Sequence, residues 1–310
     1  MAAAERMIRR AVLPGILLAS LLGAAGCERA KAPAPGMPIS SSSSPPSPAG
    51  VTAVATTKPW DDELGAMLAT PSLDGGAPVL FVRDTASNVD LDVELFNHDD
   101  HTSRATLHPG SAVRSCAWRR NASLTLSDGR AMPNSWSLAL SPGIATPFGV
   151  DGVGELLPRD SAAMVARISR LVSAIPEDSV SAPFRGLPIV VRDAWRFQLA
   201  DGSTVAVAIA MRSLNVESNP RAQAITLIAE PDPSSSAGQW RTAFSERVAG
   251  PEDRVEGMDL LAAFQVHGAR PAVALVREGD AGLQVEIVER IAPGVWTVRW
   301  SSSALPCAKT

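Results

Sequence analysis

The sequence predicts a mainly β protein built of antiparallel four-stranded meanders, arranged as propeller blades or as a sandwich, with one amphipathic helix near residues 160–175. Three observations lead to this fold class. Apolar residues alternate strictly with acidic residues in 89–95, which is the period of a strand with one buried face. Similar short segments recur between Gly, Pro and Asn turn signals. The last third of the chain contains one series of such segments twice.

The composition is that of a globular protein and argues against nucleic acid as a partner. The chain has 310 residues and a formal net charge of -4. Binding to a phosphate backbone needs a concentrated basic surface, which this charge balance does not favour. Residues 59–303 amount to roughly 245 residues, enough for one large domain or two small ones with a substantial core.

Residues 1–26 are predicted to be an export signal. Arg9-Arg10 precedes an apolar run, 11–25, that ends at Gly26-Cys27. The basic start favours the cytoplasmic side of a membrane, and the run is too short for a permanent spanning helix. An ordinary cleaved secretory signal with an incidental Cys27 is the alternative.

The segment Ala24-Ala25-Gly26-Cys27 resembles the lipobox of bacterial lipoproteins, a small aliphatic tetrapeptide that ends in the lipid-bearing cysteine. Ala24 departs from the family pattern, which prefers Leu at that position. The resemblance implies cleavage before Cys27 and a diacylglycerol group on its sulfur. Glu28 stands where the family's inner-membrane retention signal usually has Asp, so the resemblance implies an outer-membrane location in the cell envelope.

Residues 27–58 are predicted to form a lipid-anchored tether. The stretch is rich in Pro and Ser, includes an unbroken run of serines at 40–44, and has few large apolar side chains. Such a composition cannot bury a core and behaves as a partly extended spacer. The same composition would also suit a contact with peptidoglycan or another glycan.

Residues 59–182 are predicted to form a β-rich region that includes the helix. Strands are expected at 78–82, 89–95, 123–126 and 135–140. The helix is expected to begin after Asp160 or Ser161 as N-cap and to end before Pro176, because the apolar residues between them recur at helical spacing. A weaker helical pattern spans 60–68.

Residues 183–305 are predicted to contain two copies of a four-stranded meander, starting near Trp195 and near Met258. The matching segments are 207–212, 225–230 and 240–245 in the first copy and 273–277, 285–289 and 296–301 in the second. A repeat of this length indicates stacked or radially arranged antiparallel sheets.

Residues 195–303 resemble FG-GAP-type β-propeller modules, chiefly in 260–264 followed by Gly268-Ala269-Arg270-Pro271 and a further strand. The resemblance implies blade-like sheets. In that family, Asp residues near the Arg-Pro pair bind calcium, whereas this chain has Gln265, Val266 and His267 there. These residues do not offer a comparable set of oxygen ligands, so we do not expect calcium binding.

Two cysteines, Cys116 and Cys307, remain when Cys27 carries lipid. In an oxidising compartment they would form a disulfide that closes a loop of about 190 residues, which the chain-entropy model values at roughly 4–5 kcal/mol. The alternative is a buried Cys116 and a free Cys307.

Three histidines, His98, His101 and His108, lie close together in the sequence and beside Asp99-Asp100. Imidazoles and carboxylates at close range can hold zinc or another divalent ion, and a site with an open position can activate water. The alternative is a plain polar turn at 97–102 between two strands, in which the histidines are only solvated.

These features favour an exported, lipid-anchored envelope protein that is a non-catalytic binding or structural module without a cofactor. Its partners would be the membrane, through the lipid on Cys27, and an envelope protein or a glycan. The chain has no Gly-x-Ser-x-Gly motif and no phosphate-binding glycine loop. One alternative is a metal-dependent envelope hydrolase that uses the three histidines. Another is a carbohydrate-binding module in which Trp195, Trp240, Trp296 and Trp300 line a glycan groove, although Trp at recurring strand positions more often belongs to a core.

Overall fold

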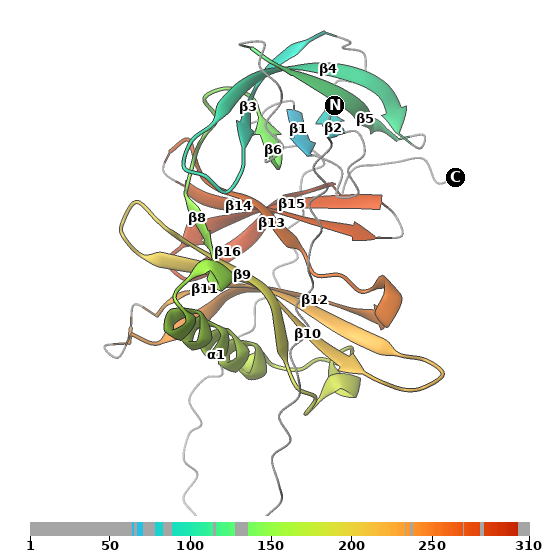
Figure 1. Ribbon diagram of the computed structural model, residues 1–310, viewed down its shortest axis with the longest axis vertical. Coiled ribbons are helices and arrows are strands. Elements are labelled where there is room, and N and C mark those ends of the chain that lie inside the picture. Colours follow the sequence, from blue (N-terminus) through green and yellow to red (C-terminus); the bar gives the residue numbers. More distant parts are fainter. Residues whose placement is uncertain are drawn as a thin grey trace, which may run out of the picture. The chain divides into compact units, whose positions relative to one another are not determined.

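The computed structural model describes residues 64, 67–70, 78–82, 89–113, 116–127, 136–232, 234–235, 238–268, 270–279 and 282–302 (Figure 1). The predicted signal peptide and tether, with Cys27, lie outside these residues, as does Cys307. In the described part the chain is mainly β, every strand pairing is antiparallel, and one α-helix is present. The predicted fold class is therefore confirmed.

The strands fall into three sheets, and their bounds are as follows. They are β1 (Met67–Thr70), β2 (Val79–Val82), β3 (Leu91–Phe96), β4 (Ser103–Val113), β5 (Cys116–Leu126), β6 (Leu138–Leu140), β7 (Ala145–Pro147), β8 (Val150–Gly152), β9 (Val190–Gln198), β10 (Thr204–Leu214), β11 (Arg221–Pro231), β12 (Trp240–Pro251), β13 (Asp259–Val266), β14 (Arg270–Gly279), β15 (Gly282–Ala292) and β16 (Val295–Ser301). The helices are η1 (Val153–Glu155), α1 (Pro158–Ala174), η2 (Ala182–Phe184) and η3 (Glu252–Arg254).

Strands β1 to β6 close into a barrel in the order β1-β2-β5-β4-β3-β6, and β1 pairs with β6 to complete it. Side chains that alternate along the strands fill its interior, as the period of a strand requires. They are Leu80, Val93, Leu95, Ala105, Leu107, Ala122 and Ala139, all buried. The sequence predicted separate strands in this region but not their closure into a barrel.

The predicted helix over 60–68 is wrong at its C-terminal end. Met67 and Leu68 belong to β1, which pairs with Phe81 and Val82 of β2. A short apolar run has no clear period, so it suits a helix or a strand equally well. Pairing with β2 on one side and β6 on the other favours the strand, because a helix of this length is unstable on its own.

The two predicted four-stranded meanders are present, and each gains a fifth strand from the segment after the barrel. We name the sheet β16-β15-β14-β13-β7 the inner sheet, and the sheet β12-β11-β10-β9-β8 the helix-side sheet. Strand β7 pairs with β13 and β8 pairs with β9, so consecutive short strands enter different sheets. These three-residue strands had no recognisable pattern in the sequence.

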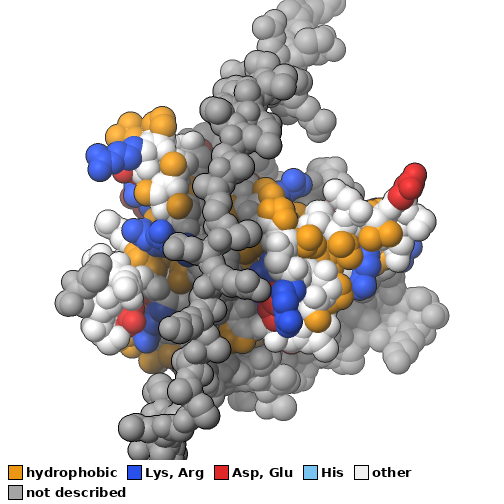
Figure 2. Space-filling view, turned by 90° about the horizontal axis from the view of Figure 1, so that it is seen from below, with side chains coloured by type: hydrophobic (Ala, Val, Ile, Leu, Met, Phe, Trp, Pro, Cys, Tyr) orange, Lys and Arg blue, Asp and Glu red, His pale blue; other side chains and the backbone are white. Residues whose placement is uncertain are grey.

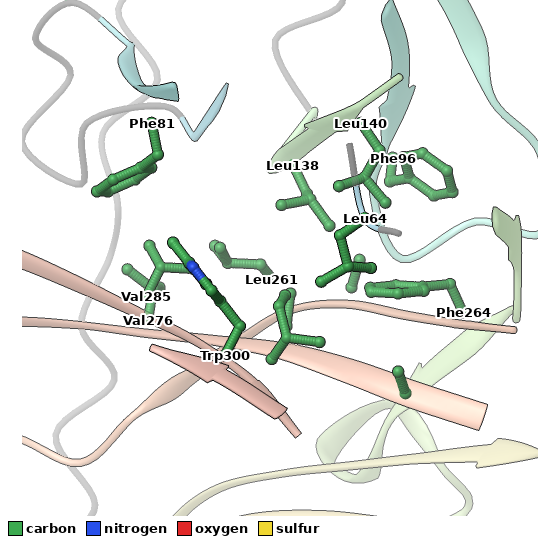
Figure 3. Close-up of a cluster of buried hydrophobic side chains, with 14 of the residues drawn as sticks. Leu64, Phe81, Phe96, Leu138, Leu140, Leu261, Phe264, Val276, Val285 and Trp300 are labelled. Atoms are coloured by element: carbon green, nitrogen blue, oxygen red, sulfur yellow. The ribbon is translucent and has the colours of Figure 1, made fainter. Parts of the chain in front are cut away.

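A hydrophobic cluster joins the barrel to the inner sheet (Figure 3). Phe81 of β2 meets Trp300 of β16 edge to face, with ring centroids 5.7 Å apart. Phe96 of β3 lies 6.0 Å from Phe264 of β13. Burial of each such side chain stabilises the fold by about 1.5–3 kcal/mol, so this cluster holds the barrel against the sheet.

The opposite face of the inner sheet packs on the helix-side sheet. On β14, Ala274 and Val276 contact the barrel cluster, whereas Val273 and Leu275 contact the second sheet. Both faces are covered, which explains why these strands are continuously apolar rather than alternating. The two repeated sheets therefore lie face to face, as in a sandwich.

Helix α1 covers the outer face of the helix-side sheet (Figure 1). Its buried residues Met164, Ile168 and Val172 recur at helical spacing and pack on small side chains of β10. The sequence predicts a start after Asp160 or Ser161, but the helix begins earlier, at Pro158. Proline suits the first helical position because its fixed φ is helical and no N–H is needed there.

The face seen in Figure 2 mixes hydrophobic, polar and charged side chains, and its Lys and Arg side chains are spread over several places. None of the helices in the described part of the chain has the length and apolar character that crossing a bilayer requires.

Candidate functional site

The turn between β3 and β4, residues 97–102, is an ordered polar turn. The side-chain oxygen of Asn97 accepts a hydrogen bond from the backbone N–H of Asp99 at 2.7 Å, and its amide donates to the Asp99 carboxylate at 2.7 Å. Asn closes such turns through its own side chain. The N–H of Val150 donates to the carbonyl of His98 at 2.7 Å, which fixes the turn beside β8.

His98 faces the protein rather than solvent. Its Nε2 lies 3.0 Å from the carbonyl oxygen of Leu260 in β13, and its ring meets that of Trp195 in β9 edge to face at 6.3 Å. A carbonyl only accepts, so Nε2 carries the proton in this contact. His98 therefore connects the turn to the inner sheet and to the helix-side sheet.

The other two histidines have separate partners. His101 lies 3.2 Å from Asp100 on the surface. His108, in β4, contacts Asp90 through Nδ1 at 2.8 Å and Thr125 through Nε2 at 2.9 Å. Within the described residues, no three His, Cys, Asp or Glu side chains stand close enough to hold a metal ion. The predicted histidine ligands are therefore not brought together into a site.

A cleft of about 320 Å³ opens beside the turn. It is formed by the turn, the segment before and within β8, and the β9–β10 hairpin. Its lining residues are Asp100, Gly149, Asp151, Arg196, Phe197, Gln198 and Thr204. Gly149 lies close beneath the turn, since a Cβ added to it would be 3.5 Å from Cβ of Asp100.

The cleft presents hydrogen-bonding groups on paired strands. Arg196 Nε donates to the Asp151 carboxylate at 3.1 Å, so these two charges offset one another. Gln198 and Thr204 are directly opposite each other on β9 and β10. Asp100 adds a further carboxylate, which leaves an excess of negative charge at the cleft. This set of donors and acceptors suits non-covalent binding of a polar, positively charged group.

A smaller cavity of about 130 Å³ lies on another side of the same turn. Its lining residues are Leu95, Phe96, Asn97, Asp99, His101, Ser103 and Trp136. Asp99 and His101 thus face one cavity while Asp100 faces the other. The turn that the sequence singled out therefore contributes residues to both hollows.

The tryptophans do not form the glycan groove considered from the sequence. Trp296 and Trp300 are each 3 % exposed and belong to the two clusters between the sheets and the barrel. Trp195 and Trp240 are half-buried, and the Arg167 guanidinium lies over the Trp240 ring at 4.9 Å. Their recurrence in the sequence is therefore explained by packing.

The predicted disulfide lies outside the described residues. The backbone of Cys116 begins β5, but its side chain is not described, and neither is any part of Cys307. The pairing stays a prediction.

Three glutamates are buried among the described residues, Glu230, Glu286 and Glu289, and none of them was singled out from the sequence. Each lies within an apolar strand segment, at 225–230 and at 285–289, and this was the available signal. A charge in a strand covered on both faces must find donors inside the protein. Glu230 and Glu286 meet this requirement to different degrees, because Glu230 has donors at both of its oxygens and Glu286 at one only.

Glu230 of β11 has a complete set of donors from the inner sheet. Arg290 Nε and Nη2 each donate to one of its oxygens at 2.8 Å. The N–H of Gly294 donates at 3.0 Å, and the indole N–H of Trp296 donates as well. The carboxylate is 2 % exposed and joins the two sheets.

Comparisons with protein-family models, curated proteins and solved structures give no match for this chain. The resemblances to a lipoprotein signal and to FG-GAP-type blades therefore depend only on the residues quoted for them. Function is inferred from the cleft beside the 97–102 turn and from the N-terminal sequence.

Proposed function

We propose that the chain is an exported, lipid-anchored protein of the cell envelope whose folded part binds a partner without catalysing a reaction. The location is supported by Arg9-Arg10, the apolar run that follows, and the tetrapeptide ending at Cys27. The tether at 27–58 would hold the folded part away from the membrane surface.

The cleft beside the 97–102 turn carries the binding part of the proposal. Its volume of about 320 Å³ falls at the lower end of the range for small-molecule sites, which suits one long side chain rather than a whole domain. Asp100 and Asp151 supply acceptors, and Gln198 and Thr204 supply neutral polar groups. We therefore propose a Lys or Arg side chain of another envelope protein as the bound group.

Site-specific cross-linking in cells tests the binding proposal. A photoreactive amino acid at Thr204 should form an adduct with an envelope protein, and the double variant Asp100→Lys with Asp151→Lys should abolish it through charge repulsion. The same photoreactive amino acid at Glu217, on the exposed turn between β10 and β11, is the matched control. An adduct that forms equally in the charge-reversed variant would contradict the proposal.

Cell fractionation tests the anchor separately. Cys27→Ser removes the sulfur that would carry lipid, so the protein should move from the membrane fraction to the soluble fraction. Unchanged membrane retention of this variant would rule out the lipid anchor and leave the cleft proposal untouched.

A further inference from the structure

Two glutamates from different sheets lie close together at the interface between the inner and helix-side sheets. Glu246 belongs to β12, and Glu286 belongs to β15. Glu286 is 6 % exposed, and Glu246 is half-buried. Two carboxylates in such a place repel each other unless cations or protons offset their charge.

Among the described residues, one cation faces this pair. Arg277 of β14 lies 2.8 Å from Glu246 through Nη1. Its Nε and Nη2 donate to the side-chain oxygen of Gln284 at 3.0 and 2.9 Å. A single guanidinium therefore faces two carboxylates, which leaves one negative charge without a counterion.

The hydrogen bonds reach only one oxygen of each carboxylate. Gln284 donates to Oε1 of Glu286 at 2.8 Å, and the Ser301 hydroxyl of β16 donates to the same atom at 3.1 Å. Oε2 of Glu286 and Oε2 of Glu246 are both buried, and neither has a hydrogen-bond partner among the described residues. A buried ionised oxygen without a donor is costly, and the described residues supply no donor to either of these two atoms.

We propose that Glu246 and Glu286 hold one proton between them in the folded protein and so form a pH-responsive contact between the two sheets. The proton removes the uncompensated charge beside Arg277 and supplies a donor where the side chains supply none. When it is lost, two carboxylates face one guanidinium, and the attraction between the sheets weakens. The groups that act on Glu286 are Glu246 from β12, Arg277 from β14, Gln284 from β15 and Ser301 from β16.

The expected direction of the pH effect follows from Glu286, which is the more buried acid of the pair. Burial, followed by repulsion from Glu246, raises the pKa of Glu286 from 4.5 to about 7. Between these two pH values the folded chain binds a proton that the unfolded chain has released. Stability from this group is therefore fully present below about pH 4.5 and is lost as the pH rises to about 7 and above.

Urea unfolding of the full chain, followed by Trp fluorescence at several pH values from 5 to 8, tests the proposal. The folding equilibrium constant of the wild type should fall on the order of 100-fold across this range because of Glu286. Glu286→Gln keeps the shape and cannot ionise, so it should flatten the profile. Glu252→Gln, on the exposed η3 helix, is the matched control and should keep the wild-type profile.

A second measurement reads the proton directly. The infrared carbonyl stretch of a protonated carboxylic acid should be present at pH 6, should disappear at pH 8, and should be missing from Glu286→Gln at both pH values. Glu246→Gln should make the slope shallower without removing it, because it removes the like charge but leaves Glu286 buried. A wild-type profile that does not change with pH, or one that both Gln variants retain, would overturn the proposal.

Discussion

The interface between the inner and helix-side sheets contains two buried carboxylates that differ in how fully they are satisfied. Glu230 receives donors at both of its oxygens, from Arg290, from the backbone of Gly294 and from Trp296. Glu286 receives donors at one oxygen only. The two sites are joined by β15, since Arg290 and Glu286 belong to the same strand.

The difference teaches that burial alone does not set the state of a carboxylate. A buried ionised group is stable when the surrounding strands present enough donors, as they do at Glu230. Where the surrounding strands present too few hydrogen-bond donors, the protonated carboxylic acid has the lower free energy. The same pair of sheets thus contains an ion pair whose carboxylate has donors at both oxygens and, four residues from Arg290 along β15, the site that we propose responds to pH.

The largest effect should come from removing the satisfied carboxylate. Glu230→Ala leaves the Arg290 side chain, which is 13 % exposed, without its buried carboxylate and leaves the Trp296 N–H without an acceptor. We expect the free energy of unfolding to fall by about 3–5 kcal/mol. Urea unfolding measures this, with Glu217→Ala on an exposed turn as the control, which should change the value by less than about 0.5 kcal/mol. Equal losses in both variants would contradict the comparison.

The comparison is sharpened by replacing each carboxylate with an amide and recording stability against pH. Glu230→Gln should lower stability at every pH and keep the wild-type slope between pH 5 and 8, because the Glu286 site is intact. Glu286→Gln should remove that slope, which corresponds to about 2–3 kcal/mol over the range. If both variants lose the slope equally, the pH response does not belong to the Glu286 site.

A smaller loss of stability is expected from a substitution at Gly294, the turn residue whose N–H donates to Glu230. Gly294 has a φ of +65°, and a Cβ there would lie 1.9 Å from Nε of Arg241. Gly294→Ala should lower the unfolding free energy by about 1–3 kcal/mol through backbone strain and this collision. Gly268→Ala is the matched control, because its φ is +81° but, apart from its chain neighbours, no described residue has an atom within 4 Å of the added Cβ. Thermal unfolding should show a smaller loss for Gly268→Ala, and the opposite order would contradict the steric argument.

The smallest effect should come from the exposed acid near the satisfied site. Asp201 lies 3.5 Å from Arg290 but is 57 % exposed, so Asp201→Asn should change stability by less than about 0.5 kcal/mol at pH 7. Hydrogen bonds from Ser203 lower the pKa of Asp201 below its usual 3.8. A lowered pKa stabilises the fold above that pH, so wild type and variant should converge in urea unfolding as the pH falls further. A loss as large as that of Glu230→Ala would show that exposure does not separate the two acids.

Local signals in the sequence were sufficient for the two repeated meanders. Strands β10 and β11, and later β14 and β15, are long apolar runs bounded by turn residues such as Asp201-Gly202, where Gly202 has a φ of +80°. Helix α1 was found because Met164 and Ile168 repeat at its period. These elements are long enough to show a clear period, whereas a few apolar residues suit a helix or a strand equally well.

The barrel required information that no local pattern contains. Its closure pairs Leu68 of β1 with Leu140 of β6, strands of four and three residues that lie far apart in the chain. Such short segments have too few residues to display a period. For the same reason the fifth strands β7 and β8 were not foreseen.

The sequence predicted either a metal site formed by the histidines or a plain polar turn at 97–102, and it did not predict the cleft. The direction of each histidine depends on distant residues, since His98 meets the carbonyl of Leu260, which is 162 positions away. His108 instead meets its strand neighbour Thr125 and Asp90. The cleft likewise combines Asp100 with Arg196 and Thr204, which only the packing of β8 to β10 beside the turn brings together.

The sequence by itself determined the fold class, the two meanders and the central part of the helix, because these depend on the spacing of apolar side chains along short stretches of chain. Only the tertiary structure decided which polar groups meet. Glu230 and Glu286 occupy similar apolar strand segments, yet each also depends on donors from other strands, such as Arg290 for the first and Ser301 for the second. The number of donors around a buried carboxylate depends on which strands face it, and that number sets whether it stays charged or binds a proton.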